Sequence, residues 1–562
     1  MEEKKCRSQG TLEKKPENVA VRCCFKAMGY SDYELDGRSV IGIANAWNTI
    51  VPGHSNLKEL GEQVKKGIYA GGGTAVEFGV IGGCDGIADW GDGMYFSLPS
   101  REVICDSIEL ETRMSHLDGL VLLGSCDKIV PGMLMAAARL NIPSIFLNGG
   151  PMLGGVEFDG RQSDQTTPDE AMGMMAAGCV SGQQILELED LVTPGCGSCA
   201  YLGTANSMCC VAEALGMSLP GSALIPAVYA ERLRMGFETG RRICQMVRED
   251  MTPRQIITEK SVRNAIRVVN AISASTNTVI HLAAIAAEAE LNMDAVREFR
   301  TIGRRVPHIA RVNPAAKWNM EDFHRAGGIP RVMEKLGDLI ETEAETCTGK
   351  TVGENLAAYS YGYPENPQII TERETPFSEF GGIAVLEGNL APDTGITKPG
   401  AFDKSLYHFT GRARVFDGED AANEAILDRK IQPGDVVVIR YEGPKGGPGM
   451  REMYHAMKYL YGLGLGTKTA LITDGRFSGT NNGCFVGHIS PEAAEGGPIA
   501  IVEEGDLIEI DVEKGRLELK VSQREIEKRM ADWKPPVKEI PRGYLRQYAK
   551  LVAPANRGAV ME

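Results

Sequence analysis

The sequence predicts an α/β protein: an N-terminal α/β domain built on a parallel sheet, followed by a smaller, mostly β, barrel-like C-terminal domain. Before residue 353, apolar runs of strand length alternate with stretches of helical spacing, the pattern of a parallel sheet with helices on both faces. From Gly381 on, short apolar strands alternate with glycine-rich turns, which is typical of a β-barrel. The segment Gly353–Glu379 is rich in Pro, Glu and Thr and reads as a linker. We therefore place the two domains at 1–365 and 366–562.

Length, charge and cysteine content indicate what kind of protein to expect. At 562 residues the chain is too long for one ordinary hydrophobic core, so two domains are expected. The net charge of −15, without a basic cluster, argues against nucleic acid as a partner. The charged N-terminus has no secretory signal, and no run reaches the roughly 18 apolar residues of a membrane span. We expect a cytoplasmic protein, in which the fourteen cysteines indicate metal binding or catalysis rather than disulfides.

The first domain is organised around residues 117–140, LDGLVLLGSCDKIVPGMLMAAARL. The pattern predicts a strand at Leu120–Leu123, a turn at Cys126-Asp127-Lys128, a helix from Pro131 and another strand at Ile142–Leu147. The turn places a thiol, a carboxylate and an amine at the carboxyl end of a buried strand, where open α/β sheets bind ligands. Two interpretations remain open here: part of a metal site, or a buried structural cysteine beside a solvated turn.

The other elements follow from the same patterns. Residues 1–35 are polar and are expected to form a loosely packed arm. In the rest of the first domain we expect strands at Ser39–Ala46 and Ala75–Ile81, a helix at Leu57–Ile68, a helix from Ser100, and a helix-rich segment at 221–300. The second domain is expected to contain strands at Ile383–Leu386, Asp435–Arg440, Thr469–Thr473, Ile499–Val502, Leu507–Ile510 and Leu517–Val521.

Three glycine-bounded turns each offer a cysteine: Cys84, Cys126 and Cys199. Their separations of 42 and 73 residues match no zinc finger, which uses close pairs. Single cysteines on separate turns at a sheet edge suit an iron–sulfur cluster held by thiolates. Buried structural cysteines are the alternative, and the pair Cys196-Gly-Ser-Cys199 could form a redox couple or half a zinc site.

An acidic set accompanies these cysteines: Asp85, Asp127 and Glu452, with Asp92 nearby. Oxygen ligands of this kind suit Mg²⁺, although a solvated loop would explain any one of them alone. Lys128 is awkward in a cation site as an ammonium group, but it would offer an oxygen ligand if carbamylated. Ser478 lacks the G-x-S-x-G setting of a hydrolase nucleophile, so by itself it reads as a turn serine.

These stretches closely resemble the family of dihydroxy-acid dehydratases and 6-phosphogluconate dehydratases, from Gly37 to about Val521. The most specific segments are SLPSREVICDSIE, LDGLVLLGSCDKIVPGM, GTANSM, ALGMSLPGS, ASTN, GPGMREM and TDGRFSGTNNGCFVGHISPEAAEGGPIA. The resemblance implies a hydro-lyase that removes water from a small 2,3-dihydroxy carboxylate to give a 2-keto acid. It also implies an α/β domain followed by a β-barrel domain, in homodimers or homotetramers.

The resemblance also assigns roles. Cys126 and Cys199 match cluster cysteines of the family, and Ser478 matches the serine proposed to remove the C2 proton. The magnesium ligands of the family match Asp85, Asp127, Lys128 (as N6-carboxylysine) and Glu452. Further candidates for contact with the substrate, or for support of the metal ligands, are His54, Asp92, Thr204 and Asn206.

The sequence departs from the family pattern at one cysteine, and this difference affects the expected cluster and substrate. Family members with a [2Fe-2S] cluster carry a cysteine directly after a proline, whereas this chain has Val51-Pro52-Gly53-His54 there and offers Cys84 instead. We therefore expect Cys84, Cys126 and Cys199 to hold a [4Fe-4S] cluster, with [2Fe-2S] as the alternative. We expect a sugar acid as substrate, with 2,3-dihydroxyisovalerate and its homologue as the alternative. A non-catalytic metal-binding protein and a thiol oxidoreductase remain as competing hypotheses.

Overall fold

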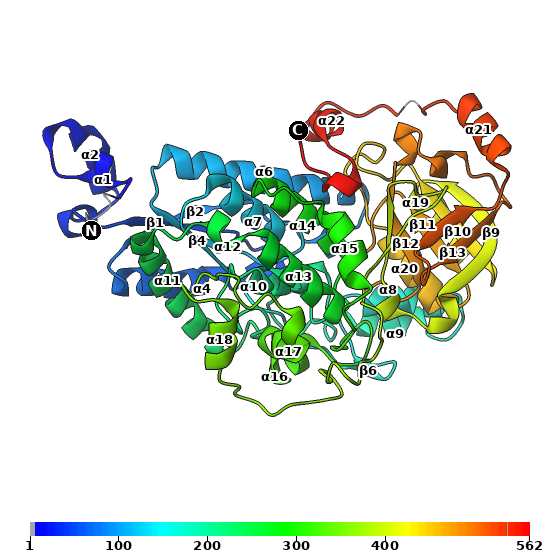
Figure 1. Ribbon diagram of the computed structural model, residues 1–562, viewed down its shortest axis with the longest axis horizontal. Helices are drawn as coiled ribbons and strands as arrows, with labels where there is room; N and C mark the ends of the chain where they lie inside the picture. Colours follow the sequence, from blue (N-terminus) through cyan, green and yellow to red (C-terminus); the bar gives the residue numbers. More distant parts are fainter. Residues whose placement is uncertain (1–5, 537) are drawn as a thin grey trace.

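Two separate β-sheets organise the chain, one in each half (Figure 1). The structure is a computed structural model, and it describes residues 6–536 and 538–562. A four-stranded parallel sheet lies in the first half, and an eight-stranded, barrel-like sheet lies at the opposite end of the long axis from the N-terminal arm. The predicted fold class is confirmed. Within the described residues, no helix is long and apolar enough to cross a membrane.

The first sheet has the strand order β2-β1-β3-β4, with all neighbours parallel. Its strands are β1 (Val40–Asn45), β2 (Thr74–Gly79), β3 (Gly119–Leu123) and β4 (Ser144–Leu147). Every residue of β1, β3 and β4 is buried, as expected for apolar strands covered on both faces. The connections β1-α4-β2 and β3-α7-β4 run in opposite directions from the central pair, so right-handed crossovers place α4 and α7 on opposite faces. The order of strands therefore reverses between β1 and β3, and ligands bind at the carboxyl ends of such a pair.

The helices of this half surround the sheet and pack on one another. Those before and between its strands are α1 (Gln9–Leu12), α2 (Val19–Ala27), α3 (Asp32–Leu35), α4 (Leu57–Ala70), α5 (Asp85–Ala88), α6 (Met94–Met114) and α7 (Ile129–Leu140). A two-stranded ribbon follows, β5 (Glu157–Phe158) and β6 (Arg161–Gln162). The later helices are α8 (Thr167–Ala176), α9 (Gly182–Glu187), α10 (Thr204–Ala214), α11 (Ala230–Glu249), α12 (Pro253–Ile256), α13 (Glu259–Ala271), α14 (Asn277–Glu288), α15 (Ala295–Gly303), α16 (Met320–Arg325), α17 (Gly328–Leu336) and α18 (Val352–Ala358).

Helices α4 and α11 pack unusually closely, because glycines face each other at their contact. A Cβ atom on Gly240 would collide with the backbone carbonyl of Val64, and one on Gly67 would collide with that of Phe237. Neither carbonyl can move without distorting its helix, so the two backbones are in direct contact. This pair of helices covers one face of the sheet below the site described later.

We predict that Gly240→Ala destabilises the first half by an amount near the upper end of the roughly 1–3 kcal/mol that overpacking costs. The measurement is the urea midpoint of unfolding, followed by circular dichroism. Gly182→Ala in α9 is the matched control, because its Cβ would meet no atom closer than 3.8 Å. Equal midpoints for the two variants would contradict the backbone contact between α4 and α11.

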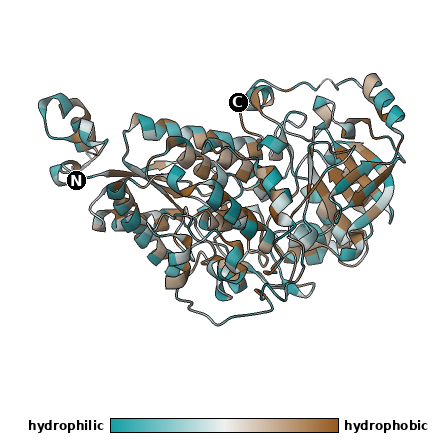
Figure 2. Cartoon of the chain, viewed as in Figure 1, coloured by the Kyte–Doolittle hydropathy of each residue, from teal (hydrophilic) through white to brown (hydrophobic). Residues whose placement is uncertain are grey.

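The second sheet has the strand order β14-β13-β9-β10-β11-β12-β8-β7. A bridge closes the barrel between its first and last strands, where Glu387 N–H donates to Gly515 O and Leu517 N–H donates to Glu387 O, both at 3.0 Å. Alternate residues of β10 face the barrel core and the helix α20, since Val436 packs in one cluster and Val437 in the other. The strands of this sheet are β7 (Ala384–Leu386), β8 (Thr394–Thr397), β9 (His408–Asp417), β10 (Asp435–Arg440), β11 (Ala470–Thr473), β12 (Cys484–Ser490), β13 (Leu507–Asp511) and β14 (Arg516–Leu519). The helices of the second half are α19 (Glu419–Leu427), α20 (Tyr454–Gly462), α21 (Gln523–Asp532) and α22 (Tyr544–Leu551). Figure 2 shows hydrophobic strands within the barrel and hydrophilic outer helices.

The chain end returns to the first half. Helix α22 packs against α6 (Figure 1), and the guanidinium group of Arg101 in α6 donates to Gly558 O at 2.9 Å and to Ala559 O at 2.8 Å. Arg101 is completely buried and also pairs with Glu102. The last residues of the chain therefore help to hold the barrel half against the α/β half.

Several expected elements differ from the structure. Ile499–Val502 was expected as a strand and is wrong: Pro498 has no N–H for a ladder and instead begins a 3₁₀ helix over Pro498–Ile501. The helix expected from Ser100 begins at Met94, where the buried side chains of Met94 and Leu98 extend its apolar face. The arm at residues 6–35 contains three short α-helices and a 3₁₀ helix at Pro16–Asn18, and the expected linker begins with α18. Residues 1–5 of the arm lie outside the described residues.

Candidate active site

The site lies where the carboxyl ends of the parallel strands meet loops of the barrel half. Cys84 follows β2, Cys126 follows β3, and Cys199 stands in the loop before α10. With Asp85, Asp127, Glu452 and Ser478 they line one cavity of about 220 Å³. The two halves therefore build the site together, and side chains that are far apart in the sequence face the same space.

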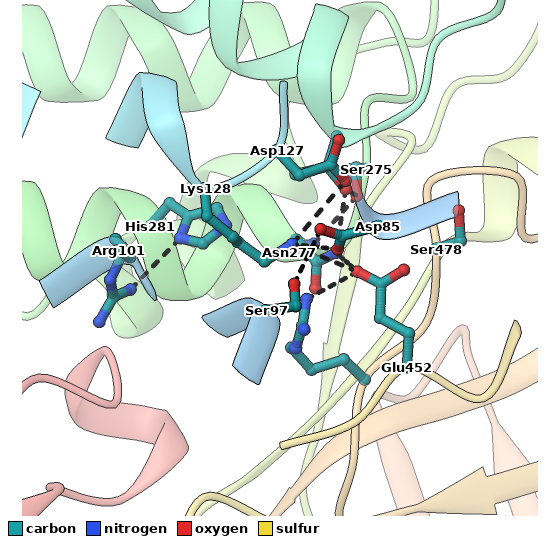
Figure 3. A network of polar contacts seen from close by, with 12 residues as sticks. Asp85, Ser97, Arg101, Asp127, Lys128, Ser275, Asn277, His281, Glu452 and Ser478 are labelled. Atoms are coloured by element: carbon teal, nitrogen blue, oxygen red, sulfur yellow. Dashed lines mark hydrogen bonds and ion pairs between the residues drawn. The ribbon is translucent and has the colours of Figure 1, made fainter. Parts of the chain in front are cut away.

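The acidic side chains form a compact group. One oxygen from each of Asp85, Asp127 and Glu452 lies within 4.8 Å of the others. The Nζ atom of Lys128 stands among them, 2.5 Å from Asp85 Oδ2, 3.7 Å from Glu452 Oε1 and 3.8 Å from Asp127 Oδ2 (Figure 3). Lys128 is buried, and its ammonium group compensates the charge of Asp85 most directly, whereas Arg476 lies nearer to Glu452, at 2.6 Å.

That compensation is incomplete. Burial, followed by the charge of Asp85, raises the pKa of Asp127. Burial also pushes the pKa of Asp85 upward, but the charges of Lys128 and Arg476 outweigh it and the pKa is lowered. The group thus holds more negative than positive charge in a poorly solvated place, which a divalent cation would offset. The donor set of three carboxylate oxygens fits Mg²⁺.

Neutral and cationic side chains fix two of these carboxylates. Arg476 donates to Glu452 Oε1 at 2.6 Å, Asn277 donates to the same oxygen at 2.7 Å, and the Ser97 hydroxyl donates to Asp85 Oδ1 at 2.8 Å (Figure 3). Sequence reasoning did not single out these residues for the site. Asn277 and Arg476 nevertheless lie inside the segments ASTN and TDGRFSG that carried the resemblance.

The three thiols lie in the wall of the same cavity. Burial raises the pKa of Cys84 to about 11 and raises those of Cys126 and Cys199 well above the usual value. Neighbouring thiolates add to the rise for Cys126 and Cys199, and the charges of Asp85 and Asp127 add to it for Cys84. A Cβ atom on Gly53 would lie 2.8 Å from Cys126 Sγ, so this position is kept free of a side chain. Buried thiolates need adjacent positive charge, and three sulfur donors around one space fit an iron–sulfur cluster.

Of the other residues predicted for the site, Thr204 and Ser478 line the cavity and Asn206 lies beside it. Thr204 lines the cavity, and its hydroxyl accepts from Asn277 at 2.9 Å. Asn206 holds the cysteine loop, since its amide donates to Cys199 O at 2.6 Å and to Tyr201 O at 2.7 Å. Ser478 is 8 % exposed and faces the cavity, with the Thr480 N–H 3.5 Å from its Oγ.

His54, Asp92 and Cys196 lie outside the residues that line the cavity. His54 is buried, which lowers its pKa to about 4, and its Nε2 accepts from the Ser125 N–H at 3.4 Å. It therefore supports the loop that precedes Cys126. Asp92 is exposed, and Cys196 is half-buried on the outer side of its loop.

The residues that line the cavity include a second polar group that sequence reasoning did not identify. Asp89 is 3 % exposed, burial raises its pKa to about 10, and neither of its oxygens accepts a hydrogen bond among the described residues. His455 Nε2 lies 3.4 Å from Asp89 Oδ2 and 3.8 Å from Asp169 Oδ1. Asp89 belongs to the Gly/Asp-rich loop that follows Cys84, which was the available signal.

Comparison with known proteins agrees with this geometry. Residues 38–355 match the N-terminal part of the dihydroxy-acid/6-phosphogluconate dehydratase family, and residues 368–559 match its C-terminal part. The chain belongs to this family. The predicted resemblance is confirmed, and membership makes the protein a dehydratase, a carbon–oxygen hydro-lyase.

Individual members of the dehydratase family are similar over almost the whole chain. A dihydroxy-acid dehydratase of Acetivibrio thermocellus is 48% identical over 555 residues, covering 98% of this chain and 99% of its own. Dihydroxy-acid dehydratases of Pyrococcus furiosus and Methanococcoides burtonii are also 48% identical, covering 98% and 96% of this chain and 99% and 97% of their own. These names support dehydration of a dihydroxy acid, and they favour the branched-chain alternative over the sugar acid expected first.

Proposed function

We propose that the protein removes water from a 2,3-dihydroxy carboxylic acid, with 2,3-dihydroxyisovalerate or its homologue as substrate and the 2-keto acid as product. The observation that carries the proposal is the single cavity shared by three thiols, three carboxylates and Ser478. The names of the similar dehydratases support the choice of substrate. A non-catalytic binding protein would have no need of all these groups in one place.

The donor sets indicate which residues would hold each cofactor. Cys84, Cys126 and Cys199 would hold an iron–sulfur cluster, [4Fe-4S] being favoured over [2Fe-2S]. Mg²⁺ would be held by the carboxylates together with Lys128 as its carbamate, the ligands being Asp85, Asp127, Lys128 and Glu452. When bound, these groups supply Lewis acidity for the departing C3 hydroxyl and positive charge for the substrate carboxylate and C2 hydroxyl.

The residues of the chain itself carry the proton transfer. The Ser478 alkoxide accepts the proton from C2, while the C3–O bond breaks with its electrons on oxygen, so that the C2 proton and the departing hydroxide together make up the water released. The double bond that forms between C2 and C3 gives an enol, which loses the proton of its C2 hydroxyl while C3 gains one, and so becomes the 2-keto acid. Arg476 and Asn277 keep Glu452 in place beside this reaction.

The test is an anaerobic assay of 2,3-dihydroxyisovalerate, its homologue and a series of aldonates, read as 2-keto acid formed. We expect the highest kcat/KM with the branched-chain acids. Formation of no 2-keto acid from any of them, by protein with a full complement of iron, would contradict the dehydratase proposal.

A sugar acid is the second candidate substrate, because Asp89 has no hydrogen-bond partner within the described chain. A hydroxyl beyond C3 would supply that hydrogen bond, whereas an alkyl group would leave Asp89 with only its 3.4 Å contact with His455, and a missing hydrogen bond in the interior costs about 1–3 kcal/mol. If the sugar acid is the substrate, Asp89→Leu lowers kcat/KM for aldonates by roughly 10- to 100-fold and leaves 2,3-dihydroxyisovalerate unaffected or improved. Equal effects on both substrates would exclude this candidate.

We further propose that the protein works as a cytoplasmic homodimer or homotetramer, with no nucleic acid and no membrane as partner. Large apolar side chains are exposed on the loops around the site, among them Ile50, Ile81, Ile87 and Trp90. A partner subunit would cover such a group. Light scattering of the purified protein tests the oligomeric state, and a monomer at micromolar concentration would contradict it.

A further inference from the structure

The loop that carries Ser478 is held in place by hydrogen bonds donated to its backbone carbonyl groups. Asn277 donates to Phe477 O at 3.2 Å, and the Asn481 N–H donates to Ser478 O at 3.2 Å. The next two carbonyls accept from lysines: Lys398 Nζ lies 2.8 Å from Gly479 O, and Lys458 Nζ lies 3.4 Å from Thr480 O. Four successive carbonyls of the loop therefore accept hydrogen bonds, two of them from ammonium groups.

Lys398 is the more unusual of the two lysines. It follows β8 and is completely buried, and among the described residues Gly479 O is the one acceptor within reach of its ammonium group. Lys458, in contrast, is paired with Glu170 at 2.8 Å. Burial, followed by the charge of Lys458, lowers the pKa of Lys398 to about 7. An ammonium group without a carboxylate partner is costly in the interior, so a purely structural explanation does not account for it.

One peptide unit connects Lys398 with the Ser478 hydroxyl. The Gly479 carbonyl that accepts from Lys398 belongs to the same peptide as the Thr480 N–H, which lies 3.5 Å from Ser478 Oγ. An ammonium group on the carbonyl polarises the whole peptide and makes its N–H a stronger donor. That donor approaches the oxygen on which negative charge develops when Ser478 loses its proton.

The peptide cannot easily turn away from this arrangement. A Cβ atom on Gly479 would lie 2.7 Å from Gly203 Cα and 3.0 Å from Ser275 Cβ, so the loop is in close contact with the start of α10. The Gly479–Thr480 peptide is thus held both by the hydrogen bond from Lys398 and by this close contact with the segment that leads into α10.

We propose that Lys398 is a positioning residue that stabilises the deprotonated form of Ser478 through the Gly479–Thr480 peptide. Lys398 does not line the cavity, so it acts on the reaction only through this loop. The inference rests on the proposed role of Ser478 in the dehydration. The charged and titratable groups around Lys398 are Lys458 on α20, with its partner Glu170 on α8, and His308, whose pKa the charge of Lys398 helps to lower.

The first experiment is the pH profile of kcat/KM for Lys398→Met, which removes the charge and preserves the side-chain length. Since the deprotonated serine loses its stabilisation, we expect the acidic limb to move upward by about one pH unit, with kcat lowered about 10-fold and KM little changed. Lys398→Arg keeps a cation and is expected to restore the limb. Lys514→Met in the same half is the control, because its ammonium group pairs with Asp511 and it does not line the cavity; its acidic limb is expected to stay in place.

A double-mutant cycle separates this role from a structural one. In the Ser478→Ala background, Lys398→Met is expected to cause no further loss of rate, because its effect passes through the serine. An unchanged pH profile in folded Lys398→Met, or an equal loss in both backgrounds, would overturn the proposal.

A second experiment does not depend on turnover. In Ser478→Cys protein, the pKa of the introduced thiol is measured from the pH dependence of its alkylation, followed by mass spectrometry of the peptide that contains it. We expect Lys398→Met to raise this pKa by about one unit. If no substrate is dehydrated but the thiol pKa shifts, the proposed function fails while the coupling holds. If the thiol pKa is unchanged, the coupling itself is wrong.

Discussion

Ser478→Ala is expected to lower kcat by about 10²- to 10⁴-fold, the usual contribution of a positioned general base. KM is expected to change little, because the acidic group at Asp85, Asp127 and Glu452 is left intact. The measurement is steady-state formation of 2-keto acid by anaerobically purified protein, with iron content determined in the same samples.

Ser144→Ala is the matched control, because Ser144 is also buried but its hydroxyl donates to Ile142 O, outside the cavity. It is expected to keep normal kcat. A Ser478→Ala enzyme that retains more than about a tenth of the normal kcat would remove this serine from the proton transfer.

The second large effect concerns the cysteines. Anaerobically purified protein is expected to contain about four irons and four acid-labile sulfides per chain, in keeping with a [4Fe-4S] cluster. Replacing Cys84, Cys126 or Cys199 with alanine is expected to remove most of the iron and the activity, because each supplies one of three sulfur donors. Iron, sulfide and the visible absorption of the cluster are measured together.

Cys196→Ala tests the same loop without touching the cavity, since Cys196 is half-buried and lies outside its lining. It is expected to keep both iron and activity, whereas a redox pair of Cys196 and Cys199 would lose its function. Two irons per chain, together with a cluster that survives Cys84→Ala but not Cys126→Ala, would contradict the proposed ligand set.

Much of the fold could be predicted because buried strands have simple patterns. β3 and β10 are continuous apolar runs, and their positions follow directly from the sequence. β9 was missed because most residues of its sequence, HFTGRARVFD, are exposed or half-buried and several are charged. The strand therefore lacks the run of apolar residues by which a buried strand is recognised. The expected strand at Ile499–Val502 shows the reverse error, since an apolar run does not reveal that Pro498 begins a 3₁₀ helix.

Some residues of the site could likewise be predicted from local sequence patterns, and others could not. That Cys84 and Cys126 would lie together could be predicted, because the carboxyl ends of parallel strands meet at one edge of the sheet. Nothing in local patterns brings Glu452 and Ser478 to that edge from the other half, and only the resemblance indicated it. Asp89 was missed because an acid in a Gly/Asp-rich loop looks solvated, and its burial depends on contacts with α8 and α20.

Residues from both halves of the chain line the cavity, so the parts of the site are synthesised at different times. Cys84, Cys126 and Cys199 emerge from the ribosome before Glu452 and Ser478 are made. The contacts of Arg101 with Gly558 and Ala559 form only when the final residues have been translated. The complete cavity therefore forms late in synthesis, and a chain cut short before Glu452 would lack one of its carboxylates.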